Sequence, residues 1–148
     1  MKIKICGLTD PKEAEYVNEQ QVDFIGMVLF FPKSKRNITL ERAKEIIACL
    51  DPGIQKVAVV VSLTLEQVQR IEQAGFDYIQ IHGEIPAGYS ESCHLSVLKA
   101  FNIRDMKDFQ PLFTNKATRL SLIPIKFFFF ASLVSAAIAA SAYSEASR

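Results

Sequence analysis

The sequence Lys-Ile-Cys-Gly-Leu-Thr, Lys4–Thr9, ends a short apolar segment with a thiol that is followed by glycine. The segment Lys2–Cys6 has the composition of a strand. Asp10 can cap a helix, with Pro11 at its first position and Glu13 at its third. We therefore predict a strand that leads directly into a helix, which is the repeating unit of α/β proteins.

The strand and helix order recurs until about residue 110, which predicts five strand–helix units. Apolar side chains at helical spacing follow Thr39, and a capping box at Thr64–Gln67 begins another helix, which Gly75 closes. Strands joined by helical crossovers form a parallel sheet, and ligands bind at the carboxyl ends of its strands in both open sheets and barrels. The pattern does not choose between these two forms. Apolar runs predict the further strands at 24–31, 57–61, 77–82 and 95–101, and another helix is predicted from Asp105.

The composition is that of a globular protein of balanced charge. The 148 residues include 17 basic and 16 acidic side chains, so the net charge does not indicate a bulk electrostatic affinity for nucleic acid or anionic lipid. The three cysteines have no paired spacing, so we expect reduced thiols rather than disulfides or a zinc site. Asp10 interrupts the first apolar segment before a signal peptide could form, and we expect a cytoplasmic protein.

Polar side chains stand at the predicted carboxyl ends of three strands. Cys6 ends the first strand, the loop Pro32–Arg36 follows the second, and Gln80 and His82 end the fourth. Three cations in that loop indicate a local anion site, in which Arg36 could hold a carboxylate through two parallel hydrogen bonds. We therefore expect a small anionic molecule as the ligand. No Gly-x-Gly-x-x-Gly sequence follows the first strand, so a dinucleotide-binding fold has no positive support.

The chain carries three motifs in order: Lys4–Thr9, Asp23–Phe30 running into Ser34–Arg36, and Gln80–Glu84. In type and spacing, these motifs resemble those of the phosphoribosylanthranilate isomerase family of tryptophan biosynthesis. The similarity extends from Met1 to about Phe109. It implies a (β/α)8 TIM barrel, of which this chain holds about five units. It also implies an Amadori rearrangement of N-(5-phosphoribosyl)anthranilate to the carboxyphenylamino-deoxyribulose phosphate, without a cofactor.

The resemblance also implies roles for individual residues. In the family, the cysteine of the first motif removes the C2 proton of the sugar, and an aspartate late in the chain donates a proton to the ring oxygen. Cys6 corresponds to this base, and we expect neighbouring cations to lower the pKa of its thiol. Arg36 corresponds to the residue that binds the anthranilate carboxylate. Gln80 and His82 belong to a motif that lines the same site, so we expect them to bind substrate.

Taken singly, these residues also have structural interpretations. A free cysteine such as Cys6 is more often a small buried hydrophobe, the three cations of the loop a solvated turn, and His82 a partly exposed loop residue. Cys49 and Cys93 keep the structural interpretation, and no metal site is predicted, because the pair Cys93–His94 is too short for one. A pentose-phosphate epimerase is a lesser alternative, since two histidines without matching spacing do not supply its metal ligands.

The family resemblance ends near residue 110. We predict an incomplete barrel domain at 1–110 and a non-family tail, helical or irregular, at 111–148. No acidic residue stands between Asp108 and Glu145, and no glycine follows Gly88. The general acid and the glycine-containing loops that hold phosphate in such barrels therefore have no counterpart here.

Three explanations of the tail stay open. A frameshift or a chimeric join near 110–115 would replace the natural end of the protein. Alternatively, the uncharged run Phe127–Tyr143 could be a membrane-spanning helix at the short limit of length. The third explanation is a helix that covers the sheet edge left after the fifth strand.

Two functions are consistent with the sequence. One is an isomerase that is weak or inactive in this chain. The other is a non-catalytic half barrel that binds an anionic ligand or a complementing fragment. An incomplete barrel exposes strand edges and apolar helix faces, which predicts self-association.

Overall fold

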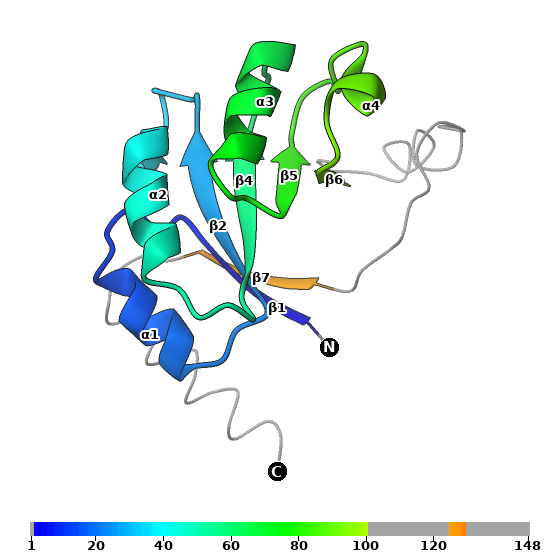
Figure 1. Ribbon diagram of the computed structural model, residues 1–148. Coiled ribbons are helices and arrows are strands. Elements are labelled where there is room, and N and C mark those ends of the chain that lie inside the picture. Colours follow the sequence, from blue (N-terminus) through cyan, green and yellow to red (C-terminus); the bar gives the residue numbers. More distant parts are fainter. Residues whose placement is uncertain (1, 101–124, 130–148) are drawn as a thin grey trace, which may run out of the picture.

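The computed structural model describes residues 2–100 and 125–129, which form a sheet with helices packed on one face (Figure 1). Six strands follow the order β6-β5-β4-β2-β1-β7, and the short β3 pairs with β2. All pairings between these described strands are parallel. The strands are β1 Lys2–Cys6, β2 Phe24–Leu29, β3 Asn37–Ile38, β4 Gln55–Val60, β5 Tyr78–Ile81, β6 Ser96–Lys99 and β7 Ile125–Phe129.

Helices connect the successive long strands of residues 2–100, as the predicted strand–helix order requires. Side chains from all four pack in one buried cluster with alternate residues of the sheet, so the helices share one face. This confirms the prediction of an α/β fold in which successive units build part of a barrel. The helices are α1 Glu13–Glu19, α2 Leu40–Ala48, α3 Leu65–Gln73 and α4 Tyr89–Ser92.

Successive side chains of each strand point to opposite faces, which gives the sheet a helix-covered face and an inner face. The helix-covered face is apolar, and its strand residues include the buried Ile25, Met27, Ile79 and Ile81. The inner face has a second, smaller apolar cluster. It also carries the two buried polar side chains of the described residues, Lys4 and Gln80. The inner face is therefore the face of the sheet that can hold a functional site.

The start of α1 differs from the prediction. The helix begins at Glu13, two residues after Pro11. The carboxylate of Glu13 accepts hydrogen bonds from the backbone N–H groups of Thr9, at 2.6 Å, and Asp10, at 3.0 Å. The acid predicted for the first turn therefore holds the loop that follows β1, and Pro11 lies in that loop.

Three predicted strands are shorter in the structure, and one of them, expected at 77–82, is observed as Tyr78–Ile81. The strand expected at 24–31 ends at Leu29, because Phe30 takes a φ of 55° in the left-handed region and turns the chain out of the sheet. The fifth long strand is Ser96–Lys99 rather than 95–101. The helix predicted from Asp105 lies outside the described residues.

A segment late in the chain joins the sheet beside its first strand. β7 pairs with β1 over five residues, with Lys2 opposite Ile125 and Cys6 opposite Phe129. These residues form a strand, unlike the helical or irregular structure predicted for the tail. The run Phe127–Tyr143, considered above as a membrane helix, begins inside this strand, and its remainder lies outside the described residues. Among the described residues, no helix is long and apolar enough to cross a membrane.

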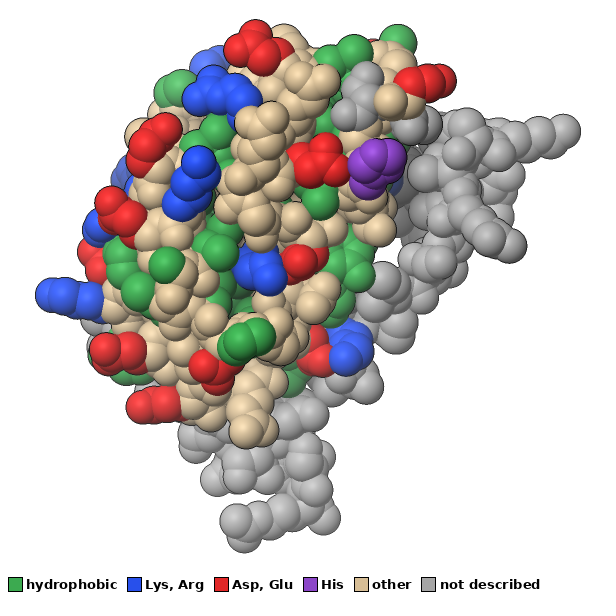
Figure 2. All heavy atoms as spheres, in the orientation of Figure 1, with side chains coloured by type: hydrophobic (Ala, Val, Ile, Leu, Met, Phe, Trp, Pro, Cys, Tyr) green, Lys and Arg blue, Asp and Glu red, His purple; other side chains and the backbone are tan. Residues whose placement is uncertain are grey.

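Charged side chains of both signs alternate over the surface in Figure 2, which shows the face seen in Figure 1. This distribution agrees with the formal net charge of +1.

The capping box of α3 predicts a measurable loss of stability when it is removed. The Thr64 hydroxyl accepts from the backbone N–H of Gln67 at 3.3 Å, and the Gln67 side chain accepts from the N–H of Thr64 at 2.9 Å. We expect Thr64→Ala to lower the free energy of unfolding by about 1 kcal/mol. Urea unfolding followed by circular dichroism measures this. Thr64→Ser keeps the hydroxyl and should unfold near the parent midpoint, and equal losses in both variants would contradict the capping role.

Candidate active site

Cys6 occupies the last position of β1, on the inner face of the sheet. It lies opposite Gly26 of β2, and its side chain is 3% exposed. A Cβ atom placed on Gly26 would lie 2.8 Å from the Cys6 Sγ and 3.1 Å from the Lys4 Cε. Both side chains therefore use the space that the missing Gly26 side chain leaves. Glycine at this position lets a thiol and a lysine meet over one strand.

Arg36 reaches the same strand end from the loop after β2. Its Nη1 donates to the carbonyl oxygen of Gly7 at 3.2 Å. The loop is held by its own side chains, because the Asn37 Oδ1 accepts from the Phe31 N–H at 2.7 Å and the Ser34 Oγ accepts from the Arg36 N–H at 3.2 Å. Gly7 has a φ of 96°, and a Cβ atom there would come within 2.6 Å of Arg36. Glycine after the thiol thus makes room for the guanidinium.

The end of β5 supplies the other two predicted site residues. Gln80 is buried on the inner face, and its Oε1 accepts a hydrogen bond from the Lys4 ammonium. Its Nε2 lies 3.0 Å from the Nε2 of His82, a residue that is partly exposed to solvent. The next residue, Gly83, passes the end of β4 so closely that a Cβ atom would lie 2.4 Å from the Val61 carbonyl oxygen. The glycine of this motif therefore sets the exit of the chain from the site.

The electrostatics of the thiol differ from the expectation. Burial raises the pKa of Cys6 above its ordinary value, and the positive charges of Lys4 and Arg36 oppose this effect without reversing it. The prediction of a lowered thiol pKa is wrong, because removing the thiolate from water outweighs the two cations. His82 shifts in the opposite direction. Its pKa is lowered by partial burial and then by repulsion from Lys4 and Lys99, which favours the neutral imidazole.

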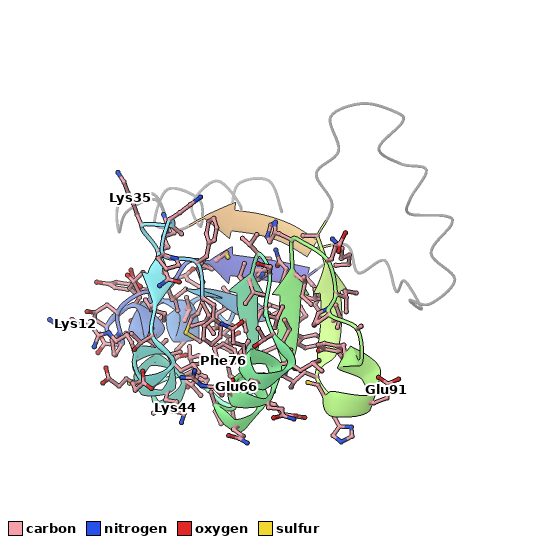
Figure 3. The ribbon with its side chains drawn as sticks, turned by 90° about the horizontal axis from the view of Figure 1, so that it is seen from above. Lys12, Lys35, Lys44, Glu66, Phe76 and Glu91 are labelled. Atoms are coloured by element: carbon pink, nitrogen blue, oxygen red, sulfur yellow. The ribbon has the colours of Figure 1, made fainter. Side chains whose placement is uncertain are left out.

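The structure brings together four side chains from three strand ends: Cys6, Arg36, Gln80 and His82. The other cations of the predicted anion site behave differently. Lys33 and Lys35 are exposed, and Lys35 points away from the sheet (Figure 3). Sequence reasoning missed Lys4, which is fully buried beside Cys6. Its signal was a lysine two residues before the thiol, on the same face of the strand.

The sequence model of N-(5'-phosphoribosyl)anthranilate isomerase matches residues 3–123. This chain belongs to the phosphoribosylanthranilate isomerase family. It is 38% identical over 112 residues to the isomerase of a Thermoanaerobacter species, covering 74% of this chain and 54% of that protein. The isomerase of Bacillus cereus is 37% identical over 114 residues, covering 74% and 55%. The chain thus spans about half the length of the curated relatives that it matches.

Solved isomerases of the family share the fold. The Thermotoga maritima isomerase superposes with a TM-score of 0.71 at 28% identity, covering 87% of this chain and 62% of that one. The Thermus thermophilus isomerase gives 0.62 at 31%, covering 70% and 53%. A further solved isomerase, at 0.71 and 28%, covering 88% and 66%, is a complex with reduced 1-(o-carboxyphenylamino)-1-deoxyribulose 5-phosphate. The described sheet is therefore part of the family's barrel.

The site contains acid–base and hydrogen-bonding groups. Within residues 2–100 and 125–129, no group of three or more His, Cys, Asp and Glu side chains is placed to hold a metal ion. The other two cysteines lie away from the site. Cys49 is exposed at the end of α2, whereas Cys93 is buried at the end of α4 and its Sγ accepts from the Leu95 N–H at 3.3 Å.

The space over Gly26 predicts the effect of adding one methyl group. Gly26→Ala would force Cys6 and Lys4 apart, and we expect a loss of about 1–3 kcal/mol in the free energy of unfolding from overpacking. Gly53→Ala is the matched control, since a Cβ atom there has nothing within 4 Å. Urea unfolding of both variants tests this. Equal free energies of unfolding for the two variants would contradict the prediction, because they would show that the inner face can accommodate a methyl group at position 26.

Proposed function

We propose that this chain carries the base-bearing and carboxylate-binding part of a phosphoribosylanthranilate isomerase site. The observation that carries the proposal is the convergence of the buried Cys6 thiol and the Arg36 guanidinium at one strand end. Membership of the isomerase family supports the reaction class, because the motifs that supply these two groups lie within the matched residues 3–123.

The proposed reaction is an Amadori rearrangement with two proton transfers. Protonation of the ring oxygen opens the sugar and leaves an iminium at C1. Cys6, as thiolate, then removes the proton from C2, and the electron pair of that C–H bond neutralises the iminium. The resulting enolamine tautomerises to the ketose. Each step moves a proton, so the reaction needs neither an oxidant nor a metal to balance.

Arg36 is proposed to bind the anthranilate carboxylate. Its guanidinium now donates to the neutral Gly7 carbonyl oxygen, and a carboxylate is a stronger acceptor for the same donors. Gln80 and His82 are proposed to face the substrate from the end of β5. A solved relative is a complex with a reduced carboxyphenylamino-deoxyribulose phosphate. Arg36, Gln80 and His82 are proposed to bind a ligand of this class.

The general acid is the part of the reaction without a candidate in the chain. No acidic residue stands between Asp108 and Glu145, and the chain covers 54% of the first Thermoanaerobacter relative. We therefore propose that the 148 residues alone turn over little substrate and that a complementing segment supplies the acid and the phosphate loops. A half barrel that only binds an anionic ligand is the competing function.

Complementation of a bacterial strain that lacks the isomerase separates these functions. The chain alone should give little or no growth without tryptophan. Co-expression with the part of the Thermoanaerobacter isomerase that this chain does not match should restore growth. Cys6→Ser should abolish that growth, whereas Cys49→Ser, at an exposed position outside the site, should keep it.

Three results would contradict the isomerase proposal. Growth that persists in Cys6→Ser would show that the thiol is not the base. Absence of growth with both segments present, when both are soluble and associated on a sizing column, would favour the binding function. Growth supported by the added segment alone would show that this chain does not contribute to the isomerase activity.

Carboxylate binding by Arg36 has its own test. Arg36→Lys keeps the charge but loses the planar pair of donors, so we expect the affinity for the reduced product analogue to fall about tenfold to a hundredfold. Lys35→Gln, at an exposed neighbour that points away from the sheet in Figure 3, should bind as the parent does. Anthranilate fluorescence in a titration measures both. Equal weakening in the two variants would indicate a diffuse electrostatic attraction instead.

A further inference from the structure

Lys4 is a lysine in an unusual place, because it is fully buried in the middle of β1. Lysine is almost never fully buried unless its ammonium has partners. Burial lowers the pKa of Lys4, and the neighbouring Cys6 acts on it in the opposite sense. The fold therefore places a desolvated cation on the strand that carries the thiol.

The two side chains are close neighbours. They are two residues apart on one strand, so they point to the same face, and both pack over the single missing side chain of Gly26. No other cation of the described residues has this relation to Cys6, because Arg36 approaches from the loop and contacts the Gly7 carbonyl oxygen. Lys4 thus acts on the thiol from within the sheet.

Gln80 and His82 fix the ammonium in this position. An ammonium only donates, so the Gln80 side chain must turn its Oε1 toward Lys4 and its Nε2 toward His82. The Gln80 amide then donates to the His82 Nε2, which requires a neutral ring with its proton on Nδ1. Hydrogen bonds thus run from Lys4 to Gln80 and from Gln80 to His82. They fix the orientation of the Gln80 amide and the tautomer of the His82 ring.

We propose that Lys4 is the positioning residue that stabilises the thiolate of Cys6, with Gln80 and His82 orienting its ammonium. The thiol is buried too deeply for water to support its charge, and the nearby ammonium takes over part of that role. The use of the thiolate as a base rests on the proposed isomerase function. The ionisation of Cys6 itself is a property of the unliganded chain.

Titration of Cys6 tests the pair directly. Thiolate formation is followed by ultraviolet absorbance against pH, and the difference from the Cys6→Ser variant isolates this cysteine. This measurement needs no reagent to enter the buried site. Lys4→Met and Lys4→Gln remove the charge, and both should raise the midpoint by about one pH unit or more, which is a loss of about tenfold in thiolate at a given pH below the midpoint. Lys4→Arg, which keeps the charge, should recover part of the shift.

Lys2→Met is the matched control. Lys2 lies on the same strand and face but is exposed, with its ammonium on the Asp23 carboxylate, so its removal should leave the Cys6 midpoint unchanged. Circular dichroism confirms that each variant is folded, and Lys4→Gln serves where Lys4→Met fails to fold. An unshifted midpoint in a folded variant without the Lys4 charge overturns the proposal, as does an equal shift in Lys2→Met. Because no substrate is present, this outcome is independent of whether the chain supports isomerisation.

Discussion

The space over Gly26 is the constraint on which the inner face of the sheet depends. A strand residue normally fills its share of that face, and Phe24, two positions earlier, does so. At Gly26 the place is taken by the side chains of a neighbouring strand, Lys4 and Cys6. A parallel pairing that sets Cys6 opposite Gly26 is required for this, and a slip of one residue would turn the thiol to the helix-covered face.

Two opposing effects act on the thiol within this arrangement. Burial penalises its charged form, and the cations of Lys4 and Arg36 favour it. The first effect is the larger, so the thiol stays protonated over a wider pH range than a free cysteine does. A carboxylate bound to Arg36 would partly neutralise that guanidinium and so weaken its stabilisation of the thiolate. Lys4 does not contact this carboxylate in the proposed complex, so its effect on the thiolate would remain.

Much of the site could be predicted because parallel strands end at one edge of a sheet. Cys6, Arg36, Gln80 and His82 were placed together on that argument, and their contacts agree with it. Lys4 was missed, since a lysine in a strand is usually exposed, and its position two residues before the thiol does not by itself show that it is buried. The direction of the Cys6 shift depends on how completely the fold excludes water, which a sequence pattern does not report. β7 was missed because its pairing with β1 joins residues far apart in the chain.

β7 also limits what can join this sheet. Among the described strands, β6 pairs only with β5 and β7 only with β1, and all of these strands run in the same direction. Strands added beside β6 and β7 with the same parallel pairing as the rest of the sheet would have to run parallel to both. A β-hairpin cannot do this with its two strands, because they are antiparallel to each other. Addition of strands that run in this one direction therefore requires crossover connections, which in parallel sheets are usually helices and not tight turns.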